Sequence, residues 1–502
     1  MIIDTPLFQR LRGVSQTALT YLTYPSAIHT RFEHSLNCMN LASKVIRELE
    51  QSRNSISELE HAEVRLAALL HDIGHCIFSH GSEFFYRNFA EFRSVVSDDE
   101  LRFASPSEAE CVNYCILTCE AFHEMLWEPV HARCRAMYPY LDSVHLKRVA
   151  EMIIGKAPDD APSRRFQGDI INGPMDVDKL DYLARDGYFT GVNLSVDVDR
   201  LLPSLRAVLV EDQERHRKEK RLVVDQRGIA VVEQLLFARM LLYDTVYHHH
   251  KVRAANAALQ SLLQDHHARP VWPTRSKKLE SVVDFLDIDE YDFFGNKYDD
   301  VAVASQVRNL RYRVLPGRAL VLAPRALCDE DSHTAWSLNY SEFTNREDPV
   351  AQKKASQFFN DIREKIRGYA TVVGAAGLSL TDIVIDIPDP PRIGKLGHET
   401  MVQIVPEYVV QLSDLFPFHK VVTNYSTQYK YRTYVFGPEQ WTSEIAYAAF
   451  RAFSEAGIRP NNLALILAHQ EDGRATELLN RSNFTIPDWR EEFYVPDAKE
   501  TQ

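Results

Sequence analysis

Apolar residues recur at three-to-four spacing through most of the first 325 positions, a pattern typical of amphipathic helices. One β-hairpin is also expected over residues 207–224, where a polar segment separates two apolar runs. The pattern predicts helices over residues 34–49, 63–78, 111–127, 146–154, 177–185, 231–264 and 301–312. Residues 1–325 are therefore expected to form one large helical domain.

The pattern changes after about residue 325. Short β-rich runs over residues 381–388, 401–405 and 430–436 predict strands, and prolines and glycines punctuate the loops between them. Helices are expected over residues 355–369 and 441–456, the second ending at Gly457. We expect a mainly α fold, in which the helical core (residues 1–325) is followed by a smaller α+β C-terminal lobe (residues 326–502).

Composition narrows the class of protein without identifying it. The chain has 502 residues, of which 45% are hydrophobic and 25% charged, as in ordinary soluble domains. A net charge of −13 argues against wholesale electrostatic capture of nucleic acid, although a local basic groove remains compatible with it. The seven scattered cysteines form no CxxC pair, and no run has the ~20 apolar residues of a membrane span. These features predict a cytoplasmic protein without a membrane segment.

The segment LAALLHDIGHCIFSH, residues 66–80, begins as a buried helix and then becomes rich in imidazoles. His71 and Asp72 directly follow five helix-forming apolar residues, so the carboxylate needs a partner or a cation to offset its desolvation. His71 and His75, four residues apart, would share one face of a continuous helix. Gly74 would let another backbone or a substrate come close.

Two further polar residues stand in similarly apolar surroundings. His34 lies in RFEHSLNCMNLA and Asp178 in GPMDVDKLDYLARD. Each alone would be typical of a hydrogen-bonded core residue. Together with His71 and Asp72 they make a set of two histidines and two carboxylates, which suits Zn²⁺, Fe, Mn²⁺ or Co²⁺ better than Ca²⁺. The sequence therefore predicts a transition-metal site.

At this point the motifs resemble those of the HD-domain deoxynucleoside triphosphate triphosphohydrolases. The family includes bacterial dGTP triphosphohydrolases and vertebrate enzymes that join a sterile-alpha-motif domain to an HD domain. The matching segments, in the family's order, are IDTPLFQRLRGVSQ, YPSAIHTRFEHSL, LLHDIGHCIFSH, MDVDKLDYLARD and, more weakly, ARMLLYDTVYHHHKV. The resemblance covers roughly residues 2–325. It implies an HD-domain phosphohydrolase core that splits a deoxynucleoside triphosphate (dNTP) into deoxynucleoside and triphosphate.

The resemblance also implies roles for individual residues. His34, His71, Asp72 and Asp178 would ligate the divalent metal (Fe, Zn, Mn or Co), with Mg²⁺ a further candidate at the phosphates. His75 and His80 would contact the phosphates or transfer protons, although either could instead hydrogen-bond a neighbouring carboxylate. The residues expected to contact the triphosphate or the sugar are Gln16, Arg31, Lys179, Tyr182, Asp186, Arg239 and Tyr247.

One family feature is altered. The family carries a His-Glu pair on the next helix, and its histidine is the catalytic acid/base. Here the helix beginning SEAECVNYCIL places Ser107 and Glu108 at those positions. The pair His123-Glu124 has the right residues but different neighbours. If Ser107 is the true equivalent, activity would be slow, retargeted or carried by His75 and His80, with Glu108 as the remaining member of the pair.

A regulatory site is implied only in part. In the family, a nucleotide activator bridges subunits through the IDTPxFQRLR segment, so a homo-oligomer (dimer or tetramer) is expected. Three functions stay open: a dNTP triphosphohydrolase, an HD phosphohydrolase acting on another nucleotide or a nucleic-acid end, and a nucleotide sensor with little turnover. The residues that match the regulatory site are Asp4, Gln9, Arg12, Asp197 and Arg200.

Overall fold

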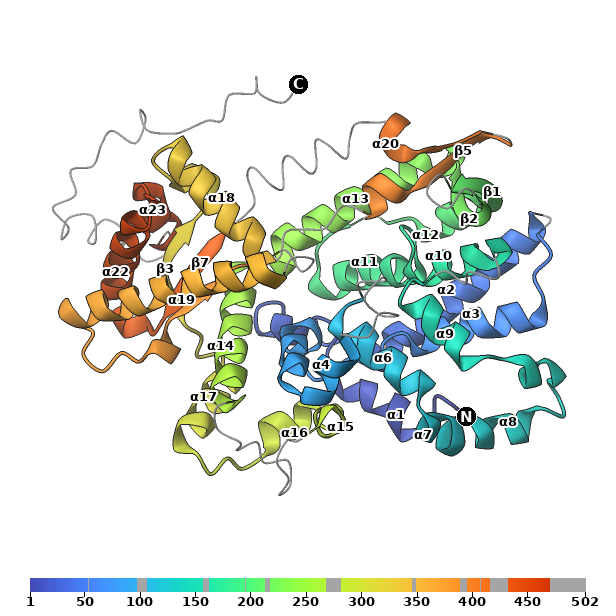
Figure 1. The fold of residues 1–502 in the computed structure, drawn as a ribbon, viewed down its shortest axis with the longest axis horizontal. Helices are drawn as coiled ribbons and strands as arrows, with labels where there is room; N and C mark the ends of the chain where they lie inside the picture. Colours follow the sequence, from blue (N-terminus) through green and yellow to red (C-terminus); the bar gives the residue numbers. More distant parts are fainter. Residues whose placement is uncertain are drawn as a thin grey trace. The chain divides into compact units, whose positions relative to one another are not determined.

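The computed structural model forms two compact units, and each is assembled from separate stretches of the chain (Figure 1). The first unit holds the described parts of Met1–Tyr247, His266–Ala304 and Ile393–Val421; the second holds the rest. The sequence-based division instead places a single boundary near residue 325. The structure describes residues 1–52, 54–96, 106–156, 162–194, 196–212, 217–267, 281–344, 349–388, 395–406, 408–415 and 432–469.

In the first unit, helix α2 (Arg31–Gln51) packs against helix α3 (Glu58–Leu70). Each begins with a capping box, formed by Thr30 with Glu33 and by Ser57 with Glu60. Both helices turn an apolar stripe inward, so hydrophobic burial holds them together. This packing brings the start of α2 beside the end of α3.

The α3 helix ends earlier than the hydrophobic pattern predicts. Leu70 is its last residue and His71 its C-cap, so the expected helix over residues 63–78 was wrong beyond Leu70. The chain turns after that, and Gly74 lies so close to another segment that a Cβ there would be 2.1 Å from the carbonyl oxygen of Ala109. Gly74 thus permits the close approach of another backbone, as its position in the motif predicted.

The remaining helices of the first unit surround this pair. Helix α11 (Val177–Thr190) packs on α2. Helix α9 (Leu146–Ile153) packs on both α3 and α6 (Glu108–Thr118). The predicted helix over residues 111–127 is in fact broken after Thr118, and a π-helical turn follows over His123–Trp127. The helices are α1 (Pro6–Gln9), α4 (Ala90–Val96), α6 (Glu108–Thr118), α7 (Glu120–Phe122), α8 (Glu128–Cys134), α9 (Leu146–Ile153), α10 (Arg165–Asn172), α11 (Val177–Thr190), α12 (Val198–Leu201), α15 (Val282–Leu286) and α16 (Glu290–Gly295).

The long helix predicted over residues 231–264 is interrupted. α13 (Ile229–Leu242) ends in a π-helical turn over Tyr243–Tyr247, and α14 (His250–His267) begins after it. The interruption coincides with the boundary between units at Tyr247 and His248. α17 (Val301–Arg311) spans another such boundary, between Ala304 and Ser305.

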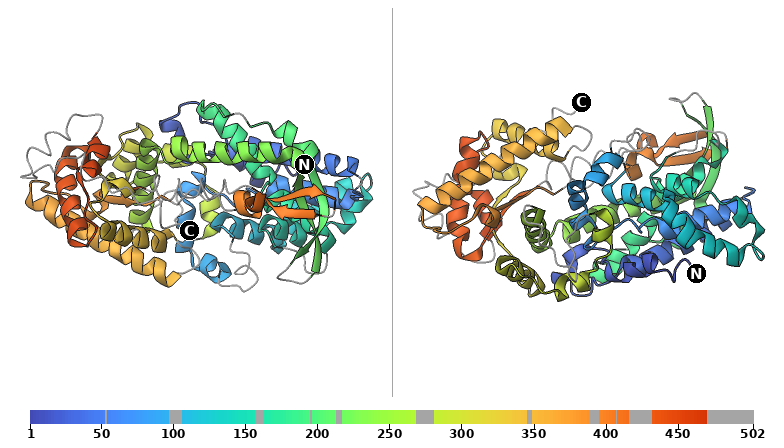
Figure 2. Two further views of the ribbon diagram at one scale, coloured as in Figure 1. Left: turned by 90° about the horizontal axis from the view of Figure 1, so that it is seen from above. Right: turned by 60° about the horizontal axis from the view of Figure 1, so that its bottom comes forward.

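A four-stranded sheet completes the first unit. The predicted hairpin is present as β1 (Leu205–Asp212) and β2 (Arg217–Asp225). β5 (Met401–Val405) pairs in parallel with β2 through Val224 and Val402, and β6 (Tyr408–Gln411) follows β5, with α20 (Leu412–Leu415) after it. Figure 2 shows these orange strands beside the green hairpin. Strands from the C-terminal third thus belong to the first unit.

The second unit is an α+β layer built on a three-stranded sheet. Its strands β3 (Gly317–Leu322), β7 (Thr433–Gly437) and β4 (Val384–Asp386) lie in that order. Trp336 and Phe453, both with no exposed surface, belong to its apolar core. β3 and α18 were not predicted. Its helices are α14, α18 (Glu330–Thr344), α19 (Pro349–Val372), α22 (Thr442–Glu455) and α23 (Asn462–His469).

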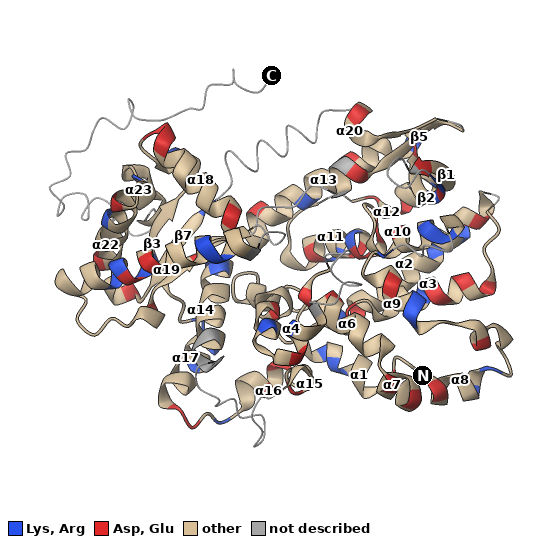
Figure 3. Cartoon of the chain, viewed as in Figure 1, with Lys and Arg blue, Asp and Glu red and all other residues tan. Residues whose placement is uncertain are grey.

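The expected fold class, a mainly α protein with smaller sheet regions, is confirmed. None of the helices in the described stretches combines the length and apolar character that crossing a bilayer requires. Lys and Arg positions alternate with Asp and Glu positions along the described helices of both units (Figure 3).

Candidate metal centre and nucleotide site

The four residues expected to ligate a metal lie together. His34 is on the first turn of α2, His71 and Asp72 follow α3, and Asp178 is on the first turn of α11. His34 Nε2 is 3.2 Å from His71 Nε2, 3.1 Å from Asp178 Oδ1 and 3.6 Å from Asp72 Oδ2. His71 Nε2 is 3.4 Å from Asp72 Oδ1 and 3.9 Å from Asp178 Oδ1. Nitrogen and oxygen atoms from three elements therefore converge on one point.

Asp181 holds His34 from behind, a role that the sequence reasoning missed. Its Oδ2 accepts a hydrogen bond from His34 Nδ1 at 2.6 Å. Asn37 and Arg185 donate to the same carboxylate, and the side chain of Asp181 is 2% exposed. Because a carboxylate can only accept, Nδ1 carries the proton and Nε2 is left to face the cluster. The DVDKLDY spacing, with Asp181 one helical turn after Asp178, was the available signal.

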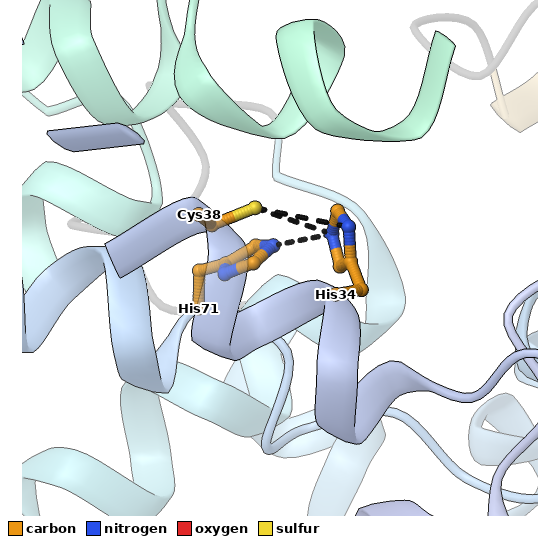
Figure 4. Close-up of side chains that lie close together, drawn as sticks. All are labelled: His34, Cys38 and His71. Atoms are coloured by element: carbon orange, nitrogen blue, oxygen red, sulfur yellow. Dashed lines mark hydrogen bonds between the residues drawn. The ribbon is translucent and has the colours of Figure 1, made fainter. Parts of the chain in front are cut away.

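Cys38, one helical turn after His34, is a neighbour of the cluster rather than a fifth ligand. Figure 4 shows the Cys38 sulfur and the His71 ring both facing the ring of His34. The sulfur is 3.6 Å from Nε2 and 3.7 Å from Nδ1 of His34. This near equality places it against the side of the ring, away from the line along which the Nε2 lone pair points. Burial raises the pKa of the Cys38 thiol to about 12, so it behaves as a small apolar group.

The charges around the cluster fit a cation. Burial would lower the pKa of His34, but neighbouring Cys38, Asp178 and Asp181 outweigh burial and raise this pKa well above its usual value. Burial would raise the pKa of Asp72, yet Arg31, His71 and His75 hold this pKa well below its usual value. The surroundings thus keep the carboxylate of Asp72 ionised and favour positive charge at Nε2 of His34. This donor set fits a divalent transition metal.

His75 and His80 share a second carboxylate. His75 Nδ1 is 2.6 Å and His80 Nδ1 3.0 Å from Glu83 Oε1, and His75 Nε2 is 3.3 Å from Asp72 Oδ1. The side chains of His75 and Glu83 are 9% and 7% exposed, whereas that of His80 is 74% exposed. Glu83 raises the pKa of His80. These contacts connect Asp72 with a solvent-facing imidazole. The ligand atoms of His75, His80 and Glu83 lie within 4.8 Å of one another, so this group could also hold a cation.

Ser107 and Glu108 have structural partners in this arrangement. Ser107 is the N-cap of α6 and accepts a hydrogen bond from the backbone of Glu110. Glu108 Oε1 accepts a hydrogen bond from Arg87 Nε at 2.7 Å. The alternative pair, His123-Glu124, lies on the exposed π-helical turn, where 52% of the His123 side chain is exposed. Among the described residues, neither pair joins the His75–Glu83 contacts.

Arg31 faces the cluster directly. Its Nη1 is 2.7 Å from Asp72 Oδ2, an ionic contact outside the direction of a regular hydrogen bond, and its Nε donates to Ser79 Oγ at 2.7 Å. The Arg31 side chain is only 3% exposed. A buried guanidinium beside Asp72 could bind an anion that reaches the four candidate metal ligands.

Three other residues expected at the substrate lie on α11 and α13. Arg239 donates to the hydroxyl of Tyr182, and its guanidinium lies 5.2 Å from the ring centre of Tyr243. Lys179 Nζ donates to the carboxylate of Asp176 and, at 2.9 Å, to the carbonyl of Gly173. In this arrangement Lys179 is therefore bound within its own helix start, and a phosphate contact by it stays a prediction.

Asp186 is held from two sides. Tyr247 donates to its Oδ2 at 2.5 Å, and His29 Nε2 is 2.7 Å from its Oδ1. His29, which stacks on Phe189, was not predicted, although it lies in the matching segment YPSAIHTRFEHSL, two residues before Arg31. Gln16 is 8% exposed, and its side-chain oxygen is buried with no hydrogen-bond partner among the described residues. These residues form a polar, largely buried group within the first unit.

The residues that match the family's regulatory site lie in local networks. Gln9 donates to the carbonyl of Ile3 at 2.7 Å and accepts from Arg12, whose guanidinium lies 3.6 Å from the ring centre of Phe32. Asp4 forms an ion pair with the amino group of Met1. Asp197 caps α12, because its carboxylate accepts a hydrogen bond from the backbone nitrogen of Arg200. A regulatory role for these residues stays a prediction.

Comparison with known proteins matches two consecutive family models. Residues 31–125 match the HD domain, and residues 196–353 match the HD associated region. The first match contains His34, His71 and Asp72, and Asp178 lies between the two matches. These matches, together with the relatives described next, confirm the predicted resemblance to the HD-domain triphosphohydrolases.

Relatives and solved structures agree with these matches. An uncharacterized protein of Methanocaldococcus jannaschii, MJ1154, is 34% identical over 52% of this chain and 44% of its own length. The deoxynucleoside triphosphate triphosphohydrolase SAMHD1 homolog of Dictyostelium discoideum is 30% identical over 49% of this chain and 42% of its own length. The chain thus spans less than half the length of these two relatives. A phosphohydrolase from Bacteroides thetaiotaomicron has the same fold, with a TM-score of 0.58, 22% identity and coverage of 87% of this chain and 95% of its own.

Proposed function

We propose that this HD-domain protein is a divalent-metal-dependent hydrolase that converts dNTPs to deoxynucleoside and triphosphate. One observation carries the proposal: His34, His71, Asp72 and Asp178 converge within hydrogen-bonding distances, with Arg31 against Asp72. The name of the Dictyostelium relative supports the choice of substrate. A divalent metal at this site would supply Lewis acidity toward a phosphoryl oxygen and lower the pKa of water.

The group formed by His75, His80 and Glu83 would provide the proton transfer. Hydrolysis at the ester bond requires a proton for the departing sugar oxygen. His80 is exposed and its pKa is raised by Glu83, so it can hold a proton near neutral pH and donate it. Glu83 also orients His75, which contacts Asp72. We assign proton donation to His80 and positioning to Glu83, with His75 facing the reacting phosphate.

The polar residues of the same unit would bind the rest of the substrate. Arg31 and Arg239 offer guanidinium groups to phosphate oxygens, which accept paired N–H donors. Asp186 and Tyr247 form a carboxylate–hydroxyl pair suited to a sugar hydroxyl. Gln16 brings a buried amide oxygen without a partner, which a substrate N–H or O–H could satisfy. Tyr182 and Lys179 complete the expected contacts.

Oligomerisation and location follow from the same proposal. We infer that the protein is a cytoplasmic homo-oligomer, a dimer or tetramer, in which the regulatory residues bind a nucleotide. Binding of a nucleotide to an assembled form would shift the protein toward that form by mass action. Light scattering with and without dGTP tests this inference, and an unchanged mass would contradict it. The residues concerned are Asp4, Gln9, Arg12, Asp197 and Arg200.

The decisive experiment identifies every product. Purified protein is incubated with each dNTP in turn, with Mn²⁺, Co²⁺, Zn²⁺, Fe²⁺ or Mg²⁺, and the products are separated by chromatography. We expect deoxynucleoside and intact triphosphate, both absent with Asp72→Ala. The exposed Asp142→Ala serves as the matched control, because Asp142 pairs only with His131 among the described contacts. Metal-loaded protein that releases neither product from any dNTP would refute the proposal.

A second candidate keeps the metal but changes the substrate. Ser107, one of the two candidates for the position of the family's catalytic histidine, caps a helix here and offers no titrating group. This observation favours a different leaving group, as in hydrolysis of another nucleotide or of a nucleic-acid end. Release of inorganic phosphate or a nucleoside monophosphate, instead of triphosphate, would favour this second function.

A further inference from the structure

The turn between His75 and His80 adopts a backbone conformation that its residues disfavour. Phe78 has φ +58° and ψ +18°, and Ser79 has φ +46°, so two consecutive non-glycine residues are left-handed. Contacts of the side chain with its own backbone make this region costly for all residues except glycine. Such a turn persists where its surroundings hold it in place.

The short helix α16 supplies the contacts that hold the turn. Glu290 Oε1 accepts hydrogen bonds from the backbone nitrogens of Phe78, at 3.0 Å, and Ser15, at 2.8 Å. Its Oε2 accepts from Ser15 Oγ at 2.5 Å. The ring of Phe78 packs edge-on against Phe293 and Phe294, with ring centres 4.9 Å and 5.7 Å away. One carboxylate and two rings of α16 therefore grip Phe78.

A series of contacts connects the Phe78–Ser79 turn with Asp72, one of the four candidate metal ligands. Ser79 Oγ donates to the carbonyl of Ser15 at 2.6 Å and accepts from Arg31 Nε at 2.7 Å. Arg31 Nη1 in turn lies 2.7 Å from Asp72 Oδ2. Ser15 is thus bound by Glu290 through its nitrogen and hydroxyl and by Ser79 through its carbonyl. A shift of the turn would move the hydroxyl that orients Arg31.

We propose that Glu290 is a positioning residue that holds the Phe78–Ser79 turn and thereby aligns Arg31 and His80. Glu290 lies outside the HD-domain match and inside the HD associated region, so the associated region would support the HD site. The effect on turnover rests on the proposed function; the effect on the turn does not. Burial raises the pKa of Glu290 to about 7 against its hydrogen bonds, and Oε1 can accept in either protonation state.

Hydrogen exchange measured by mass spectrometry tests the grip without any substrate. In Glu290→Ala we expect peptides covering residues 74–82 to exchange at least about tenfold faster, because the Phe78 N–H loses its acceptor. Glu290→Gln keeps an oxygen at Oε1 and should stay close to the unchanged protein. Asp292→Ala is the matched control, since it removes a carboxylate from the same helical turn. The β1–β2 hairpin serves as the internal reference.

Unchanged exchange of the turn in Glu290→Ala, or an equal rise in Asp292→Ala, would overturn the proposal. If Glu290→Ala does not fold, Glu290→Asp takes its place, because it withdraws the carboxylate by one methylene. A rise spread evenly over the whole unit would show a general loss of stability and would also count against the proposal.

Kinetics then connect the turn with catalysis. We expect kcat to fall about 10–100-fold in Glu290→Ala while KM and bound metal change little, since small misplacements of reacting groups have effects of this size. Glu290→Gln should restore kcat. A lower kcat that Gln does not restore would refute the role in alignment. If the unchanged protein hydrolyses no dNTP, the proposed function fails, and hydrogen exchange alone decides the fate of the Glu290 proposal.

Discussion

Two histidine–carboxylate pairs in the first unit share one chemistry and differ in their access to water. His34 pairs with Asp181, and their side chains are 0% and 2% exposed. His80 pairs with Glu83, but 74% of its side chain is exposed. A dry pair keeps one tautomer, which suits a metal ligand, whereas an exposed pair can exchange protons with water. Burial, rather than residue type, thus distinguishes the pair proposed to bind metal from the pair proposed to transfer protons.

Removing a carboxylate from the four candidate metal ligands should have the largest effect on bound metal and on activity. Asp72→Ala takes away a carboxylate whose Oδ1 lies near His71 and His75 and whose Oδ2 lies near Arg31. Since losing a partner behind a ligand already costs 10–100-fold in metal affinity, we expect more than about 100-fold here and activity at background. Elemental analysis after dialysis measures the bound metal. A variant that retained one metal per chain would contradict the assignment.

The exposed region should respond differently. His80→Ala should lower kcat by about 10²–10⁴-fold, the usual contribution of a general acid, while the bound metal remains. His131→Ala, which changes a histidine that pairs with Asp142 outside the cluster, should leave kcat unchanged. Parallel loss of metal in His80→Ala would erase the distinction between the two pairs.

An intermediate effect is expected from the carboxylate behind His34. Asp181→Asn removes the charge but keeps the shape, and an amide that turns its N–H₂ toward Nδ1 would favour the wrong tautomer. Metal affinity should fall about 10–100-fold, and saturating metal should restore most of the turnover. Competition with a chromogenic chelator measures this affinity. Affinity equal to that of the unchanged protein would show that Asp181 does not fix the imidazole.

The smallest effect should be a displaced pH profile. Glu83 raises the pKa of His80, so protonated His80 persists above its ordinary range and is lost as the pH rises through the raised value. If His80 donates the proton, activity declines along that basic limb. Glu83→Gln should move the limb to lower pH, and profiles of kcat measured at saturating metal would show it. A limb that stays in place, or moves upward, would assign the proton to another group.

The four residues that converge in the first unit could be predicted from the sequence because each lies in a compact motif. His71-Asp72 and Asp178 stand beside apolar runs, where an unpaired polar side chain is expensive. The end of α3 could not be predicted, since Ile73, Ile77 and Phe78 continue the apolar spacing although the backbone has already turned. Periodicity reports burial, and a buried turn has the same pattern as a buried helix.

The supporting contacts lay beyond sequence reasoning because they join distant segments. Glu290 reaches Ser15 and Phe78, which are 275 and 212 positions away, and nothing near Glu290 indicates either partner. Ser107 looked like a substituted catalytic residue, and its position also satisfies the ordinary rule for a helix N-cap. Sequence patterns thus identified the groups of the candidate site, but only three-dimensional contacts showed what holds them.

The pairing of β5 with β2 has a consequence for synthesis on the ribosome. The β1–β2 hairpin emerges long before Val402, its partner across from Val224, has been translated. Until then the outer edge of β2 presents unpaired backbone groups, which favour association with other chains. We therefore expect nascent chains that stop before β5 to depend on chaperones, and chains that extend beyond β6 to be released from them.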